Sequence, residues 1–284
     1  MKKIFFSLLA LILTMNAMAE RNQKYSVAVT DFTYNNKSES TSKTQKVLGT
    51  ILDIAAGQVT IDKGQYVDAV RAKVLQGIGA SYRLHAIDGP YQAGEVKTDG
   101  TTLYASGILT NISTTQRSVE DAKKKVHIEY KAQISVTVHL KDAATDKVVN
   151  SKTFTVSDYD CSWIETSEGA ITNALAALGK RVHSYYNTLF PLHASIIEGS
   201  TEKKDKQKEV YIDLGSQSGV HKGMHLKVFV TKTVAGKEAK KEIGKLKVEE
   251  IQGDEVSLCK VQKGGAEIKA ALDAGETVLV TSID

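Results

Sequence analysis

The chain has 284 residues, of which 42% are hydrophobic and 25% charged, and its formal net charge at pH 7 is +4. This near balance argues against a nucleic-acid binder, which would concentrate basic residues on one face. With two prolines and an ordinary share of apolar residues, the chain is expected to fold, and its length allows two domains with cores of their own.

The first nineteen residues have the order of a secretion signal. Two lysines follow Met1, an apolar run extends over residues 4–13, and Ala17-Met18-Ala19 supplies the small-x-small cleavage pattern. The apolar run is too short for a membrane-spanning helix, which needs about 20 residues. No cysteine lies near Ala19, so we expect cleavage without lipid attachment. The mature chain is predicted to be periplasmic, with association with the outer membrane left open but no lipid anchor.

The two cysteines, Cys161 and Cys259, fall in different predicted domains. Export permits a disulfide between them. Because they are assigned to separate domains, two buried or free thiols is the favoured interpretation, with a disulfide as the alternative.

The first part of the chain mixes strands with one helix. Residues 24–33 alternate as a core strand that ends at Asp31-Phe32, and residues 35–46 contain no apolar side chain and are expected to be a solvated loop. Residues 67–79 place four apolar side chains on one helical face, and the glycines at 77 and 79 are interpreted as stop signals. Residues 81–88 alternate again as a strand.

Three strands are predicted to follow as an antiparallel meander, over residues 103–116, 126–141 and 148–157. The second of these strands alternates over its whole length, so one side should be dry and the other wet. The same alternation is found in membrane β-barrel strands, but an aromatic girdle is missing and only Tyr130 is aromatic on the apolar face, which favours a soluble sheet.

A long helix is predicted to close this domain. Ser162 and Glu165 form a candidate capping box, and the helix should end just before Pro191. Its apolar stripe, flanked by Ala170, Ala174 and Ala177, is expected to bury against the sheet, and consists of Ile171, Leu175, Leu178, Val182, Tyr185 or Tyr186, and Leu189.

Beyond Pro191 the sequence predicts six short strands, separated by glycines and without a helix, which is typical of a small barrel or sandwich. The predicted organisation is therefore a signal peptide (1–19), an α/β (α+β) domain with a mixed sheet flanked by helices (20–191), and a small all-β domain (192–284).

Few residues suggest chemistry. His221 and His225 are four apart but lie in a glycine-marked turn without a visible third ligand, and Asp31 has no Ser-His, Cys-His or paired-carboxylate partner. The glycines at 215, 219 and 223 lack the Lys-Ser/Thr pair and the following helix of a phosphate site, and the lysine-rich runs 121–125 and 203–208 are predicted to be solvated loop tips. We therefore predict no catalytic, metal or cofactor site, and a protein that is not an enzyme.

The order of elements resembles the CsgG-like envelope family, which includes the curli secretion channel subunit and penicillin-binding-protein activators. The matching residues are Asp31-Phe32 at the end of the first strand, Ser106-Gly107 in a later strand, and the turn at residues 142–148, where Asp146 stands in place of the family's glycine and one residue more precedes Val148. The second domain is similar to the carboxy-terminal domain of the flagellar assembly protein FlgT through Leu214-Gly215, Gly219-Val220 and Gly223.

These resemblances imply binding and assembly without catalysis or cofactor. The expected function is a cell-envelope assembly or scaffold protein that contacts other envelope proteins and forms a homo-oligomer. The alternative is a subunit of an oligomeric outer-membrane secretion channel of the curli type.

Overall fold

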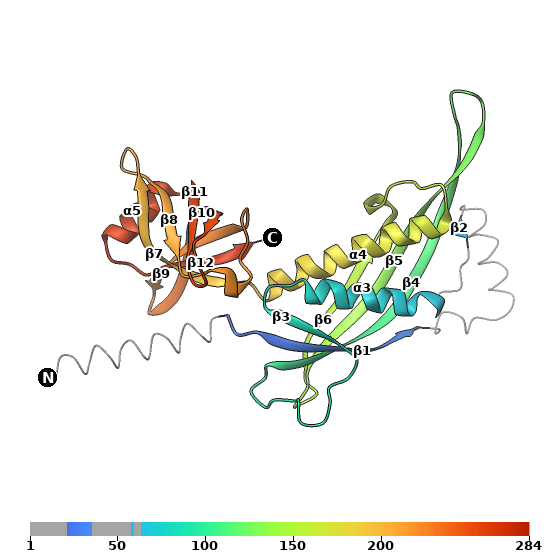
Figure 1. Cartoon of the computed structure of the whole chain (residues 1–284), viewed down its shortest axis with the longest axis horizontal. Helices are drawn as coiled ribbons and strands as arrows, with labels where there is room; N and C mark the ends of the chain where they lie inside the picture. Colours follow the sequence, from blue (N-terminus) through green and yellow to red (C-terminus); the bar gives the residue numbers. More distant parts are fainter. Residues whose placement is uncertain (1–21, 36–57, 60–63, 284) are drawn as a thin grey trace. The chain divides into compact units, whose positions relative to one another are not determined.

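The computed structural model describes residues 22–35, 58–59 and 64–283 (Figure 1). The predicted signal peptide and nearly all of the predicted loop at 35–46 lie outside these residues. The chain divides into two compact units: Tyr25–Ser184, called here the sheet unit, and Met1–Lys24 with Tyr185–Asp284, called the barrel unit.

The sheet unit is built on a mixed sheet with the strand order β3-β1-β4-β5-β6. The first strand is parallel to both of its neighbours, whereas β4, β5 and β6 form an antiparallel meander, as expected. A two-residue strand, β2, pairs with β4. The strands are β1 (Tyr25–Tyr34), β2 (Gln58–Val59), β3 (Leu84–Asp88), β4 (Thr102–Glu120), β5 (Val126–Asp142) and β6 (Val148–Val156).

Two helices, α3 (Val67–Gly79) and α4 (Ser167–Leu189), lie over the same face of this sheet (Figure 1). The predicted dry side of β5 is buried against them from Ala132 to Leu140, and the other side is only half-buried. The α4 stripe is buried as expected up to Tyr186, whereas Leu189 is exposed. The apolar side of β5 and the apolar stripe of α4 therefore contribute to the same hydrophobic core.

Gly77 does not end α3, contrary to the expectation. It is buried inside the helix, where an added Cβ would lie 2.7 Å from the carbonyl oxygen of Gly179 and 2.7 Å from the Cβ of Val182. The absence of a side chain lets α3 and α4 approach closely at this point.

The start of α4 also differs from the prediction. The helix begins at Ser167, and Thr166 caps it by accepting a 3.1 Å hydrogen bond from the backbone N–H of Gly169. The capping box of this region belongs to the short helix η3 (Asp158–Asp160). The backbone N–H and the hydroxyl of Ser157 both donate hydrogen bonds to the carboxylate of Asp160. The end of α4 at Leu189, just before Phe190-Pro191, agrees with the prediction.

The barrel unit is a closed barrel of six strands in the order β10-β11-β8-β7-β12-β9. Its core consists mainly of inward-facing aliphatic side chains such as Val210, Leu226 and Leu246. A helix, α5 (Gly265–Asp273), buries Ile268 and Ala271. The strands are β7 (His193–Glu202), β8 (Gln207–Ile212), β9 (His225–Val234), β10 (Lys237–Ile251), β11 (Ser257–Lys263) and β12 (Val278–Ile283), and a short helix η4 (Ser216–Ser218) precedes β9.

The predicted fold class is wrong. The chain is mostly β, with the closed barrel in its C-terminal region, and the mixed sheet with helices is only part of it. The physical reason is that only the β1 pairings are parallel, while the long antiparallel β4–β5 hairpin and the barrel hold most of the ordered chain. The second unit is not free of helices either, because α5 lies between β11 and β12.

Candidate functional site: the β6 edge and the surfaces beside it

The strand β6 forms one edge of the sheet and is called here the β6 edge. It pairs with β5 from Val148, opposite Lys141, to Val156, opposite Ile134, and no described strand lies on its other side. Its sequence, VVNSKTFTV, is rich in the β-branched and aromatic residues that favour extended backbone. In an antiparallel ladder every second residue directs its backbone N–H and C=O away from the partner strand, so this edge presents groups that another strand could pair with.

The two ends of the β6 edge differ in how they are held. At the far end Phe154 and Val156 are buried, and Arg181 of α4 donates a 2.7 Å hydrogen bond to the carbonyl oxygen of Thr155. At the near end Val148 and Val149 are 58% and 51% exposed. The near end is therefore an apolar, open stretch on a strand that is anchored at its other end.

The sheet face away from the helices is polar and bonded across strands. Hydroxyl pairs join β5 to β6 at Thr137 and Thr153 (2.9 Å) and at Ser135 and Thr155 (3.3 Å), and the Nδ1 of His139 lies 3.0 Å from the Oγ of Ser151. Cross-strand pairs of this kind stabilise a sheet. They fix β6 to β5 along its polar face.

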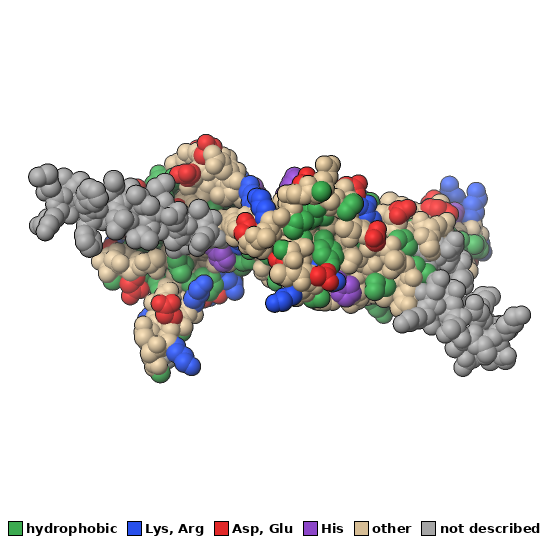
Figure 2. All heavy atoms as spheres, turned by 90° about the horizontal axis from the view of Figure 1, so that it is seen from below, with side chains coloured by type: hydrophobic (Ala, Val, Ile, Leu, Met, Phe, Trp, Pro, Cys, Tyr) green, Lys and Arg blue, Asp and Glu red, His purple; other side chains and the backbone are tan. Residues whose placement is uncertain are grey.

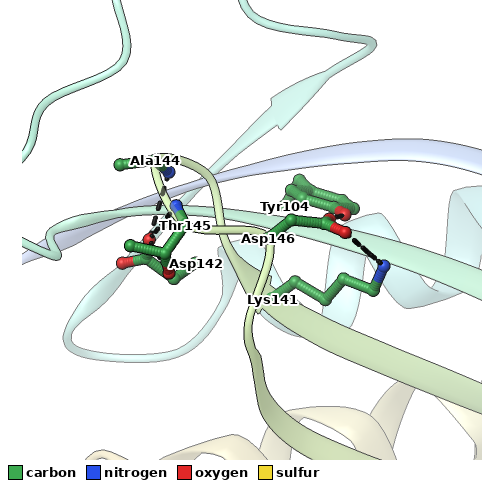
Figure 3. A network of polar contacts seen from close by, with 6 residues as sticks. All are labelled: Tyr104, Lys141, Asp142, Ala144, Thr145 and Asp146. Carbon is green, nitrogen blue, oxygen red and sulfur yellow. Dashed lines mark hydrogen bonds and ion pairs between the residues drawn. The ribbon is translucent and has the colours of Figure 1, made fainter.

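The turn between β5 and β6 holds the start of the β6 edge (Figure 3). The Oδ1 of Asp142 accepts hydrogen bonds from the backbone N–H of Ala144 (3.1 Å) and Thr145 (2.7 Å) and from the Thr145 hydroxyl. The Thr145 hydrogen bonds are the main cause that holds the pKa of Asp142 below its usual value. Asp146 has a φ of 55°, a left-handed conformation that aspartate tolerates better than most residues other than glycine.

Asp146 is also tied to the neighbouring strands. Its carboxylate is 3.2 Å from the Nζ of Lys141 and accepts a hydrogen bond from the Tyr104 hydroxyl, and the Lys141 ammonium lies over the Tyr104 ring (Figure 3). The turn connects β5 to β6 and is also bonded to Tyr104 of β4. These contacts hold in place the exposed valines that follow the turn.

Two residues noted in the sequence, Phe32 and Gly107, meet in the structure. They are partners in the β1–β4 register, and an ideal Cβ on Gly107 would lie 2.2 Å from the Cε1 of the Phe32 ring. Glycine is required here because the ring occupies the space of a side chain. The pair supports the core and is not a chemical site.

The β4–β5 hairpin extends beyond the neighbouring strands β1 and β6. The pairing of β4 with β1 stops at Leu109 and that of β5 with β6 at Ile134, whereas β4 and β5 remain paired to Glu120 and Val126. Arg117 forms an ion pair of 2.6 Å with Glu129 and stacks over the ring of Trp163 at 4.2 Å. Basic side chains gather at the end of this hairpin (Figure 2), and Val126 is 67% exposed there.

The candidate chemical residues do not form a site. Asp31 is exposed and lies within β1, at the irregularity between Val29 and Phe32, and not at the strand's end. His221 lies in a turn with its Nδ1 3.1 Å from the carbonyl oxygen of Lys222, and His225 begins β9 with its Nδ1 3.1 Å from the Gln262 side chain. Within the described part of the chain, no group of three or more His, Cys, Asp or Glu residues could hold a metal ion.

Both cysteines are free and buried, as the favoured interpretation expected. Burial raises the pKa of the Cys161 thiol, and it raises that of the Cys259 thiol to about 12. A thiol with a raised pKa forms little thiolate and is a poor nucleophile.

The glycine-rich loop before β9 is structural. Gly215 packs against the backbone at Asp254, where an added Cβ would lie 2.3 Å away, and Gly219 and Gly223 have φ values of 82° and 93°. Leu214 and Val220 are buried. These residues therefore serve a tight turn.

Among the described helices, none has both the length and the apolarity that crossing a membrane requires.

Comparison with known proteins gives no family. No family model matches the chain, and no curated protein matches it. Among solved structures, the chain is similar to a PelC dodecamer from Paraburkholderia phytofirmans, at 12% identity over 57% of this chain and 90% of that chain, with a TM-score of 0.29.

Two other solved structures show a likeness of the same order. A homologue of the neuraminyllactose-binding hemagglutinin from Helicobacter pylori is 14% identical over 59% of this chain and 83% of that chain, with a TM-score of 0.28. A DUF330 protein from Xanthomonas campestris is 14% identical over 59% and 82%, with a TM-score of 0.28. The PelC neighbours are dodecamers. At such low TM-scores and identities, these similarities say nothing about the activity of this chain.

Proposed function

We propose that the chain is a non-catalytic assembly protein of the cell envelope that works through protein–protein contacts and associates with copies of itself along the β6 edge. The observation that supports this most is an edge strand with a strongly β-forming sequence, anchored at one end and open at the other. The predicted secretion signal supports a place in the cell envelope. The resemblance to CsgG-like envelope proteins supports a role in assembly.

The β6 edge has few of the protections that monomeric sheet proteins place on their edges: a register irregularity at Val149 and the Arg181 hydrogen bond to the Thr155 carbonyl oxygen. Such edges carry charges, prolines, bulges or a covering segment. The β6 edge has one charged side chain, Lys152, and two exposed valines at its open end. At about 3.3 Å per residue, its nine residues present roughly 30 Å of strand.

The opposite edge of the sheet suggests how copies associate. The strand β3 pairs with β1 on one side, and no described strand lies on its other side. Because β3, β1, β4 and β6 all run in the same direction, a β3 strand from a second copy would continue the sheet as a parallel neighbour of β6. Contacts between two different edges are head-to-tail and close into a ring when the rotation between copies allows it.

The test is the mass of the full chain in detergent-free buffer, measured by light scattering over a range of concentrations. The wild type should have a mass that is a multiple of the chain mass. The double variant Val148→Lys/Val149→Lys should shift toward the monomer, because lysines on an edge oppose pairing. Val126→Lys is the control, since Val126 is 67% exposed in the same unit but lies at the end of the β4–β5 hairpin, beyond the pairing of β5 with β6.

A wild type that is monomeric at every concentration would contradict the proposal. So would a double variant with the circular dichroism spectrum and the mass of the wild type. Both positions are more than half exposed, so the substitutions should leave the fold intact.

The second candidate is a secretion-channel subunit, and the overhanging β4–β5 hairpin favours it. A ring of subunits that each contribute one hairpin could build a barrel. Detergent separates the two candidates: a channel subunit should need detergent to remain dispersed, whereas a scaffold should give the same mass with and without it.

A further inference from the structure

Two grooves on the barrel unit adjoin each other along β11. One has a volume of about 590 Å³ and lies between the turn at Lys222, strand β10 and strand β11. The other has a volume of about 340 Å³ and lies between the β7–β8 hairpin, β11 and the start of α5. Both are lined by Val261 and Gln262, so they form one surface, called here the lysine track.

The lysine track is strongly positive, although the net charge of the whole chain is only +4. Six lysines line it and only two acids, Glu249 and Glu267. Among the described residues none of these lysines takes part in an ion pair, although Lys227 and Lys269 of the same unit do. All six are exposed, and they are Lys206, Lys208, Lys222, Lys247, Lys260 and Lys263.

The scaffold of the track is held by backbone contacts. The backbone N–H of Gly223 donates a 2.8 Å hydrogen bond to the carbonyl oxygen of Val248, and the N–H of Val248 donates a 2.9 Å bond to that of Met224. The turn that carries Lys222 is thereby clamped to the strand that carries Lys247, while Lys260 lies opposite Lys247 in the β10–β11 register. Lysines from three chain segments therefore converge on a surface that is formed before any ligand binds.

We propose that the lysine track binds an acidic polysaccharide. A row of unpaired lysines across two adjoining grooves suits an extended polyanion better than a single small anion, because charge complementarity then acts along the chain of the ligand. The lysines supply charge, and the Gln262 side chain, 3.1 Å from the Nδ1 of His225, supplies a hydrogen-bonding group for hydroxyls.

The lining disfavours two other polyanions. Proteins that bind single-stranded nucleic acid stack its bases on aromatic side chains, and no aromatic residue lines the track. An acidic peptide would gain affinity by adding a strand or by inserting apolar anchors. The closed barrel offers no free edge at this surface, and of the two valines in the lining Val248 is 1% exposed and Val261 is half-buried.

The experiment measures the binding of a fluorescent oligogalacturonate to the full chain by anisotropy. The wild type should bind at low salt and lose affinity as salt increases. Lys247→Gln/Lys260→Gln should weaken binding about 25-fold, at about fivefold for each lysine next to an anionic surface. The matched control Lys240→Gln/Lys241→Gln removes two exposed lysines of β10 that do not line the track and should change affinity less than about twofold.

Four results would overturn the proposal. One is no binding of the oligogalacturonate at low salt, and another is an equal loss of affinity in the control variant. The third is tighter binding of polyglutamate or single-stranded DNA of equal charge, which would assign the track to a peptide or a nucleic acid instead. Neutral dextran should not bind, and binding of dextran equal to that of the uronate would also refute the electrostatic basis.

Discussion

Gly107→Ala tests the close approach of strands β1 and β4 in the sheet unit. An ideal Cβ at this position would lie 2.2 Å from the Cε1 of Phe32 and 2.5 Å from its Cδ1 and Cζ, whereas carbon atoms prefer about 3.5–4.0 Å. Phe32 is 9% exposed, so its ring cannot move aside without disturbing the core. We expect the substitution to cost about 1–3 kcal/mol of stability, the usual effect of overpacking.

The same substitution should change sign when the ring is absent. In a Phe32→Ala background there is room for the methyl group, and alanine in a strand interior is favoured over glycine by about 0.5–1 kcal/mol. Gly107→Ala is therefore destabilising in the wild type and stabilising beside Ala at position 32. This sign change is specific to the contact between these two residues.

The assay is urea unfolding followed by the fluorescence of Trp163, the single tryptophan, which lies in the sheet unit. With a slope of about 1–3 kcal/mol per molar urea, a loss of about 2 kcal/mol lowers the midpoint by roughly 1 M. If Gly107→Ala lowered the midpoint equally in both backgrounds, the steric reasoning would be refuted, and the glycine would be needed for its backbone alone.

Three further predictions concern single positions. Thr166→Ala should destabilise the chain by about 1 kcal/mol in urea unfolding because it removes the N-cap of α4, whereas Ser162→Ala should have little effect; the reverse order would refute the assigned cap. Cys259, with its pKa raised to about 12, should resist iodoacetamide at pH 8 in the native protein and react in denaturant, and rapid native labelling would contradict its burial. The pKa of Asp142 is lowered in the folded state, so its stabilisation is present above the unfolded value of about 3.9 and is lost as pH falls through the folded value. Acid titration of stability should therefore be shallower in Asp142→Asn, and identical pH profiles would contradict the turn described here.

Periodicity predicted the elements whose burial repeats regularly. The strand β5 and the apolar stripe of α4 were both identified from the sequence. An element that packs on a single face has apolar residues at a regular spacing, every second residue in a strand and every third or fourth in a helix. The close of α4 before Pro191 followed from the restriction that proline places on the preceding residue.

The errors arose where contacts between distant segments decide the structure. Gly77 has the local features of a helix stop, but it serves a contact with Gly179, about a hundred positions away. The helix α5 is only nine residues long and buries two side chains, too few for a clear periodic pattern. The fold class failed for a related reason: the chain is mostly β, and the closure of its barrel depends on pairing between distant strands such as β7 and β12.

The candidate surfaces were only partly visible in the sequence. The adjacent valines at 148 and 149 break the alternation of β6, which is a signal of an exposed apolar position, yet exposure depends on β6 being an edge. The lysine track could not be predicted, because its six lysines come from separate segments that converge only in the barrel.

The most direct test of the account is amide hydrogen exchange of Val148–Val156 at several protein concentrations. Association along the β6 edge predicts that amides of this strand become more protected as concentration rises, while the amides of β5, already paired on both sides, stay unchanged. Protection of β6 that is the same at all concentrations, in a range where the measured mass increases, would show that copies associate through another surface and would contradict the central claim.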